Sequence, residues 1–290
     1  MKVKVQAPAK INLSLDVLRR RPDGYHDVSM VMQAVSLFDY VTVENTDTKD
    51  IVILCDYEGV PCDEHNIAHK AAAAFFKYTE TENTGVKITI DKHIPTQAGL
   101  AGGSADGAAV IVALNKLFST HLKEKEMCEI GERVGADIPF CIIGGTRLAS
   151  GTGTKLKKMI SIPRCNIVIC KPEVSVSTAE AYSKIDSAAL SHPEFTSEMV
   201  KAIYARDIWM VTSCMLNDFE IALNLEEIKD VKRVMLKSKA LGACMSGSGS
   251  AVFAIFNSEK KAQKCVEALK KDYREVFLCE PEKQGCSVIE

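Results

Sequence analysis

The stretch Pro95-Thr-Gln-Ala-Gly-Leu-Ala-Gly-Gly-Ser-Ala-Asp-Gly107 joins a strand pattern at Val86 to Ile90 directly to an apolar helical pattern that begins at Ser104. Its glycines at 99, 102 and 103 allow a tight turn and a close approach of the backbone to a ligand. The free amides of the first helical turn favour an anion. The stretch is therefore either a phosphate cradle or a glycine-rich turn without a ligand.

Two familiar nucleotide motifs do not account for this stretch. It lacks the lysine of the P-loop pattern, and no Gly-x-Gly-x-x-Gly occurs in it. A phosphate cradle here would belong to a different class of nucleotide site.

Composition indicates a globular protein that acts on small molecules. The 290 residues are 47% hydrophobic, which permits a sizeable core in one large or two modest domains. The net charge is -2 and the basic residues are scattered, which argues against a nucleic-acid surface and against a polybasic membrane patch.

Cysteine usage and the N-terminus predict a cytoplasmic location. The eleven cysteines include no Cys-x-x-Cys pair, so no zinc site or redox motif is indicated, and free thiols fit a reducing compartment. The first residues alternate like a strand and lack an apolar signal core. The uncharged run from Ala240 to Ser258 has Ser246-Gly-Ser-Gly-Ser250 at its centre, which predicts strand, loop and strand rather than a membrane span.

The first half of the chain mixes strands and helices. Strands are expected at Val3 to Val5, at Ile11 to Val17 after a break near Pro8, and at 41–43, 51–54 and 86–90. Helices are expected after a cap at Asn66, from Ser104 to Leu117, from Glu124 to a stop at Gly135, and briefly after Asp137. A hairpin joins 146–149 to 154–156.

The second half is richer in helix. A strand at 166–170 precedes a capping box at Ser177-Thr-Ala-Glu180 that starts a helix carrying Tyr182. Residues 194–237 read as all-helical, strands flank the Ser-Gly run, and an amphipathic helix at 258–273 precedes a last strand near Val276. The composition shifts mildly near residue 160, which divides the chain into expected domains 1–160 and 161–290.

Four polar segments have both a functional and a structural interpretation. Lys10 and Asn12 share one side of a strand, either as site residues or as a solvated face. Tyr25 and His26 follow the turn at 22–24, and a ring beside an imidazole suits a nucleobase as well as a plain exposed turn. Asp137 is either a helix cap or the base of a phosphoryl transfer. Ser246–Ser250 is either a turn or a second backbone clamp on phosphates.

Taken together, the segments resemble the GHMP family of small-molecule kinases. The matching segments occur in family order and are Ala7-Pro-Ala-Lys-Ile-Asn-Leu13, Pro22-Asp-Gly-Tyr-His26, Ile94-Pro95, Ala98-Gly-Leu-Ala-Gly-Gly-Ser104, Gly135-Ala-Asp-Ile-Pro-Phe140, Ser177-Thr178 and Met245-Ser-Gly-Ser-Gly-Ser250. The first two separate this chain from the mevalonate, galactose and homoserine kinases of the family.

The resemblance implies a two-domain α+β fold, with an N-terminal domain like the second domain of ribosomal protein S5 and a ferredoxin-like C-terminal domain. It implies an ATP- and Mg²⁺-dependent kinase that phosphorylates a cytidylated methylerythritol on its tertiary 2-hydroxyl, a step toward isoprenoid precursors outside the mevalonate route. The alternatives are a homoserine or mevalonate kinase, against which the Tyr25-His26 segment argues, and a catalytically silent nucleotide-binding relative, against which Lys10 and Asp137 argue.

The resemblance also implies roles for individual residues. Asp137 is the base for the acceptor hydroxyl, Lys10 holds that hydroxyl, and Asn12 supports them. The cytidine-bearing substrate is expected at Tyr25, His26, Thr178 and Tyr182. ATP is expected at Asn66, Pro95, Thr96, Gln97, Ala98, Gly99, Leu100, Ala101, Gly102, Gly103, Ser104, Ala105, Gly247, Ser248 and Gly249.

One position departs from the family pattern. Ala105-Asp106 stands where many relatives carry Ser-Ser or Ser-Asp, so the hydroxyl ligands of phosphate or Mg²⁺ are not defined beyond Ser104, and no metal-binding residue is predicted.

Overall fold

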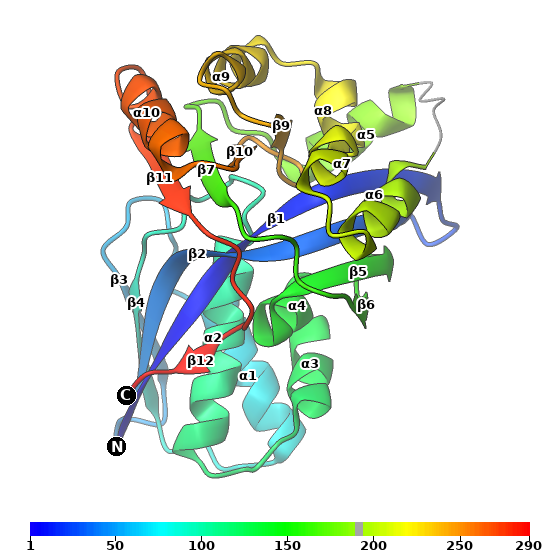
Figure 1. Ribbon diagram of the computed structural model, residues 1–290. Helices are drawn as coiled ribbons and strands as arrows, with labels where there is room; N and C mark the ends of the chain where they lie inside the picture. Colours follow the sequence, from blue (N-terminus) through cyan, green and yellow to red (C-terminus); the bar gives the residue numbers. More distant parts are fainter. Residues whose placement is uncertain (189–193) are drawn as a thin grey trace.

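The structure, a computed structural model, describes residues 1–188 and 194–290 and contains two sheets with helices packed on them (Figure 1). The larger sheet has the order β12-β1-β2-β4-β3, with β5 on β2, β6 on β5 and β8 on β1. Its strands are β1 (Lys2–Arg20), β2 (His26–Asn45), β3 (Ile51–Cys55), β4 (Val86–Asp91), β5 (Thr146–Gly151), β6 (Lys155–Lys158), β8 (Leu216–Asn217) and β12 (Ser287–Val288).

The smaller sheet has the order β11-β7-β10-β9 and is antiparallel throughout. Its strands are β7 (Asn166–Lys171), β9 (Gly242–Met245), β10 (Val252–Phe256) and β11 (Glu275–Cys279). Helices separate β7 from β9 and β10 from β11, which gives the β-α-β-β-α-β succession of a ferredoxin-like unit. The expected α+β class and ferredoxin-like C-terminal half are confirmed.

The helices lie in two groups along the chain. The first group is α1 (Ile67–Thr79), α2 (Gly102–Leu117), α3 (Glu124–Glu132) and α4 (Ile138–Ile143), and the second is α5 (Thr178–Ser187), α6 (Phe195–Tyr204), α7 (Ile208–Ser213), α8 (Asp218–Leu223), α9 (Glu226–Lys237) and α10 (Glu259–Leu269). In α10 the buried residues fall at helical spacing, at Ala262, Cys265, Val266 and Leu269, so one stripe packs against β7 and β11. No described helix is long and apolar enough to cross a membrane.

Strand β1 is continuous where the sequence predicts two strands. The prediction of a break near Pro8 was wrong, because the register with β2 shifts between Pro8 and Ala9 and the strand continues through the irregularity. A bulge tolerates a proline, which has no amide to donate to the ladder. Figure 1 shows the resulting pair of long strands, β1 and β2, running from the termini across the molecule.

Other boundaries differ modestly from expectation. Helix α3 ends at Glu132 with Arg133 as its C-cap, so Gly135 is not the cap residue. At Ser177 only half of the capping box forms, where the side chain accepts a hydrogen bond from the amide of Glu180. The stretch 194–237 is not all-helical, because Leu216–Asn217 pairs with β1 as β8.

The proposed division at residue 160 is crossed by the chain more than once. Both β8 and β12 come from the second half and pair with β1 in the larger sheet. The C-terminus also bonds back to the first strand, where the amide of Ile289 donates to the carbonyl of Lys4 at 2.8 Å. The division into domains 1–160 and 161–290 stays a proposal, and β8 and β12 connect the second domain to the sheet of the first.

All eleven cysteines are free thiols, as their spacing predicts. Burial raises the pKa of the Cys128 thiol to about 12, and it also raises the pKa of Cys170 to about 12. The thiols of Cys128 and Cys170 are therefore protonated and unreactive at neutral pH.

Candidate active site

The centre of the candidate site is an ion pair between Lys10 and Asp137. The Lys10 ammonium lies 3.8 Å from a carboxylate oxygen of Asp137 and donates a hydrogen bond to the Asn12 side-chain oxygen at 2.7 Å. The Lys10 side chain is 5% exposed whereas that of Asp137 is 34% exposed. The interpretation of Lys10 and Asn12 as a solvated strand face was therefore wrong. A buried cation beside an accessible carboxylate is suited to act on a hydroxyl group.

Asp137 occupies the N-cap position of α4, but its side chain makes no capping hydrogen bond with any described residue. Pro139 in the first turn already removes one of the amides that a cap would satisfy. Ile138 fixes the start of this helix, because a Cβ added to Gly131 would stand 2.5 Å from its Cγ2 atom. The Asp137 carboxylate is therefore paired with Lys10 and not with the amides of its own helix.

The glycine loop, residues 95–105, is held against β1 and against the Ser-Gly loop, residues 246–250. The amide of Lys10 donates to the carbonyl of Leu100 at 3.1 Å. Ser246 donates its hydroxyl to the carbonyl of Gly99 at 2.9 Å, and the amide of Ala251 donates to the carbonyl of Ala98 at 3.1 Å. Two segments that the sequence separates by some 150 positions thus form one backbone surface.

Gly99 is required at the contact between these loops. Its φ is +70°, and a Cβ at this position would stand 2.0 Å from the carbonyl oxygen of Ser246. Gly247 is close to the ion pair, since a Cβ added to it would stand 3.1 Å from the Lys10 ammonium. The Ser-Gly loop therefore covers the Lys10 side chain.

Helix α2 begins without a side-chain cap. Its N-cap is Ala101 in the left-handed conformation, and no described side chain accepts a hydrogen bond from the first-turn amides. Such an uncapped N-terminus is a ready site for an anion. It directly follows the glycine loop, which contacts β1 at Lys10, as a phosphate cradle would require.

Asn66 and Gly103 lie at the edge of this cradle, and both have structural contacts. The Asn66 side-chain oxygen accepts from the amide of Ala68 at 2.8 Å, and its amide group donates to the carbonyl of Pro61 at 2.6 Å. The predicted cap on α1 is confirmed. A Cβ on Gly103 would stand 3.1 Å from Cδ1 of Ile67, so this glycine has a packing reason in addition to the predicted ligand.

Two of the residues predicted to hold the nucleobase, His26 and Tyr182, are in direct contact. The rings of His26 and Tyr182 stack directly, with centroids 4.6 Å apart and planes 15° apart. Tyr25 is 67% exposed. His26 lies 2.8 Å from a carboxylate oxygen of Asp186 through Nε2. A nucleobase could lie between the His26 and Tyr182 rings only if these rings separated. The exposed Tyr25 ring could stack on a nucleobase without such a change.

Thr178 connects this region to the Ser-Gly loop. Its hydroxyl lies 3.2 Å from that of Ser248, at the N-terminus of α5. One residue expected at the substrate, Thr178, therefore lies beside one expected at ATP, Ser248.

Two structural features of the site escaped sequence reasoning. Asn217 donates to the carbonyls of Met245 and Gly247, both at 2.8 Å, and so fixes the Ser-Gly loop from β8. A charged cluster of Asp39, Lys92 and Asp106 lies buried beside the glycine loop. No local pattern marks either feature, because each depends on residues far apart in the chain.

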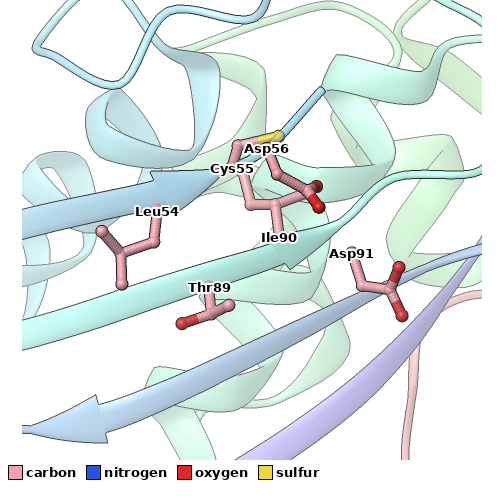
Figure 2. A pocket seen from close by; sticks show the side chains of 6 residues that line it. All are labelled: Leu54, Cys55, Asp56, Thr89, Ile90 and Asp91. Atoms are coloured by element: carbon pink, nitrogen blue, oxygen red, sulfur yellow. The ribbon is translucent and has the colours of Figure 1, made fainter. Parts of the chain in front are cut away.

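A surface hollow of about 440 Å³ lies elsewhere, at the ends of β3 and β4 (Figure 2). Its lining is Leu54, Cys55, Asp56, Thr89, Ile90 and Asp91. Figure 2 shows the side chains of Asp56 and Asp91 among those that line it. A lining with two acidic groups and no basic one disfavours an anionic nucleotide, so we place the candidate site at the two loops.

Buried Asp106 predicts a distinctive pH dependence of stability. Burial raises its pKa to about 7 although Lys92 opposes the shift. In the unfolded chain this group loses its proton near its ordinary pKa of about 3.9, so between about pH 4 and pH 7 the folded state binds more protons and stability falls as pH rises. We expect Asp106→Asn to flatten this part of the profile, measured by urea unfolding of parent and variant at several pH values. A parental slope in the variant would contradict the assignment.

Comparisons with known proteins match both halves of the chain. Residues 66–145 match the GHMP kinases N terminal domain, and residues 199–275 match the GHMP kinases C terminal domain. Two similar curated proteins are named 4-diphosphocytidyl-2-C-methyl-D-erythritol kinase. The one from Acetivibrio thermocellus is 45% identical, covering 95% of this chain and 98% of its own, and the one from Clostridioides difficile is 40% identical, covering 99% and 97%.

Solved structures are similar over nearly the whole chain. A crystal structure of 4-(cytidine 5'-diphospho)-2C-methyl-D-erythritol kinase superposes with a TM-score of 0.80 at 29% identity, covering 97% of this chain and 99% of its own. Homoserine kinase from Cytophaga hutchinsonii superposes with a TM-score of 0.79 at 23% identity, covering 99% and 97%, which shows a shared fold alone.

Proposed function

This chain belongs to the GHMP kinase family, among the relatives named 4-diphosphocytidyl-2-C-methyl-D-erythritol kinase, and from that premise we propose that it transfers a phosphoryl group from ATP to the 2-hydroxyl of 4-diphosphocytidyl-2-C-methyl-D-erythritol. The products would be the 2-phosphate and ADP, within the non-mevalonate route to isoprenoid precursors. The observation that carries this proposal is the Lys10–Asp137 pair, 3.8 Å apart under the two loops.

The proposed chemistry follows from the positions of these groups. Asp137 takes the proton of the 2-hydroxyl, and the hydroxyl oxygen forms a bond to the γ-phosphorus of ATP. The bond from that phosphorus to the β–γ bridging oxygen breaks, and ADP leaves with the electron pair. Lys10 stabilises the developing negative charge, and its hydrogen bond to Asn12 at 2.7 Å fixes its direction.

ATP is proposed to lie with its phosphates on the amides of the glycine loop. Helix α2 offers its uncapped first turn there, and the Ser-Gly loop would close over the other side through Gly247, Ser248 and Gly249. Asn66 would stand near the adenine, although both ends of its amide already have partners.

Mg²⁺ is proposed to enter with the nucleotide. Among the described residues, the grouping of acidic and imidazole side chains with metal-ligand spacing is the exposed set Asp63, Glu64 and His65, outside the glycine loop. Mg²⁺ commonly keeps its waters and binds chiefly through substrate phosphates, which needs no protein cage. The site therefore fits an ion carried by ATP, and we assign it no protein ligand.

The experiment that tests the function is a substrate panel. The purified protein is incubated with ATP, Mg²⁺ and, separately, the cytidylated methylerythritol, homoserine and mevalonate, while ADP is measured and the product is followed by ³¹P NMR. We expect ADP and a new phosphomonoester with the cytidylated alcohol. ADP formed instead with homoserine or mevalonate would overturn the proposed substrate, and ADP with none would indicate a silent relative.

Recognition of the cytosine ring is proposed to depend on Tyr25. Because this side chain is 67% exposed, Tyr25→Ala is expected to leave the unfolding midpoint near that of the parent. Loss of stacking should weaken binding of the cytidylated substrate by about 1 to 3 kcal/mol, while the KM for ATP stays unchanged. The matched control is Tyr204→Ala, an exposed tyrosine at the end of α6. Equal substrate KM values in Tyr25→Ala and the parent would place the base elsewhere.

A further inference from the structure

Three charged side chains lie buried together beside the glycine loop, each from a different segment. Asp39 is on β2, Lys92 follows β4, and Asp106 is on α2, and their side chains are 0%, 2% and 4% exposed. The Lys92 ammonium donates to Asp39 and, at 2.8 Å, to Asp106. We refer to these three residues as the buried cluster. Nothing in the proposed phosphoryl transfer uses them directly.

The buried cluster holds both ends of the glycine loop. At the entrance, the second Asp39 oxygen accepts from the amides of His93 and Ile94, at 2.6 Å and 2.8 Å. At the exit, a Cβ on Gly102 would stand 2.9 Å from the Lys92 ammonium, and Asp106 lies on the same helix one turn later. The residues between these points are those predicted to surround the ATP phosphates.

The charge balance of the buried cluster is unusual for a stabilising ion pair. With all three groups ionised, one cation would face two anions out of contact with water, and a buried net charge is costly. In addition, Oδ1 of Asp106 is buried and has no hydrogen-bond partner among the described residues. A neutral carboxylic acid at Asp106 relieves the excess charge. The raised pKa of Asp106, about 7, points the same way.

Lys92 remains a cation in this setting. Burial alone would lower its pKa, but the two carboxyl groups raise it by more, so the net direction is upward. A buried ion pair is often no more stable than apolar residues of the same volume, and its best-attested use is to specify one arrangement. The consequence of the buried cluster is therefore expected in the geometry of the loop.

We propose that Lys92 is a positioning residue for ATP, which together with Asp39 and a neutral Asp106 ties the two ends of the glycine loop and holds its amides in the arrangement that receives the phosphates. This inference rests on the proposed function, in which ATP occupies that loop. The specificity lies in two directional hydrogen bonds from one ammonium group, which an apolar residue cannot reproduce.

The first test is Lys92→Met in the full chain. We expect the KM and Kd for ATP to rise by about 10- to 10²-fold, because a phosphate site loses much of its effect when its donors are misplaced by about 1 Å. The Kd for the cytidylated substrate, by isothermal titration calorimetry, should stay near that of the parent. In the ligand-free protein, hydrogen exchange of the amides between residues 93 and 103 should accelerate.

A second pair of variants keeps the inference testable if Lys92→Met does not fold. Asp106→Leu leaves a balanced Lys92–Asp39 pair and removes only the link to α2, so it should fold and show the same rise in ATP KM. Asp106→Asn mimics the neutral acid and should change that KM by at most about threefold, less than the effect of one net hydrogen bond.

Each outcome has a defined meaning. Parental ATP affinity and parental loop exchange in both Lys92→Met and Asp106→Leu would overturn the positioning role. An Asp106→Asn variant as impaired as Asp106→Leu would show that the carboxylate acts as an anion, against the neutral form proposed. A parent protein that binds no ATP would overturn the proposed function. Accelerated hydrogen exchange of the loop amides in Lys92→Met would, even then, show that the buried cluster holds the glycine loop in place.

Discussion

Replacing Asp137 with Asn is expected to lower turnover by about 10²- to 10⁴-fold, the usual contribution of a positioned general base. The variant should unfold at nearly the parental midpoint, because the Asp137 side chain makes no capping bond with a described residue and is itself 34% exposed, 3.8 Å from Lys10. The measurement is turnover with the cytidylated substrate at saturating ATP, together with thermal unfolding. ATP binding should persist, since the loop amides are untouched.

A matched control separates capping from catalysis. Asp207 also occupies an N-cap position, and its side chain accepts from the amides of Trp209 and Met210. Asp207→Ala is therefore expected to cost about 1 kcal/mol of stability and leave turnover unchanged, the reverse of the pattern expected for Asp137→Asn. Near-parental turnover in Asp137→Asn would exclude Asp137 as the base.

The partner of Asp137 adds an independent check. Lys10→Met should also lower turnover, and the double variant should lose less than the product of the two single losses, because both groups act on one hydroxyl. Fully multiplicative losses would instead indicate that Lys10 and Asp137 act at separate points.

The second large effect is expected at Gly99. Gly99→Ala places a methyl group 2.0 Å from the carbonyl oxygen of Ser246, so the glycine loop and the Ser-Gly loop must move apart. Because these loops are proposed to contact ATP from two sides, we expect kcat/KM for ATP to fall by about 10²-fold. The measurement is an ATP titration at saturating alcohol, with circular dichroism to verify folding.

Gly151→Ala is the matched control for Gly99→Ala. Gly151 has a φ of +67°, close to that of Gly99, but the nearest atom to its Cβ position is 3.6 Å away, an ordinary contact. The control therefore carries the conformational cost of a positive φ, about 1 kcal/mol, without the clash. If the two variants lose ATP-dependent activity equally, the contact between the loops has no part in nucleotide binding.

Local patterns were sufficient for the elements that carry the site. Period-two alternation predicted β4, helical spacing predicted α2, and Asn66 was correctly identified as the cap of α1. These features depend on residues within a few positions of one another, which a sequence displays directly. The same patterns could not show that β1 is continuous, because the register shift at Pro8 is defined only against β2.

The sequence by itself determined which groups are available: Lys10 near Asn12, Asp137 before Pro139, and the glycines at 99, 102 and 103. Only the tertiary structure decided how they are used, because burial and charge pairing depend on contacts between distant segments. It buried Lys10 against Asp137, left that carboxylate without a capping bond, and stacked His26 on Tyr182. It also brought Asp39 and Asp106 to Lys92. No spacing in the chain predicts this cluster, because the energy of a charge pair depends on the distance between the groups in the folded structure and not on their separation in the sequence.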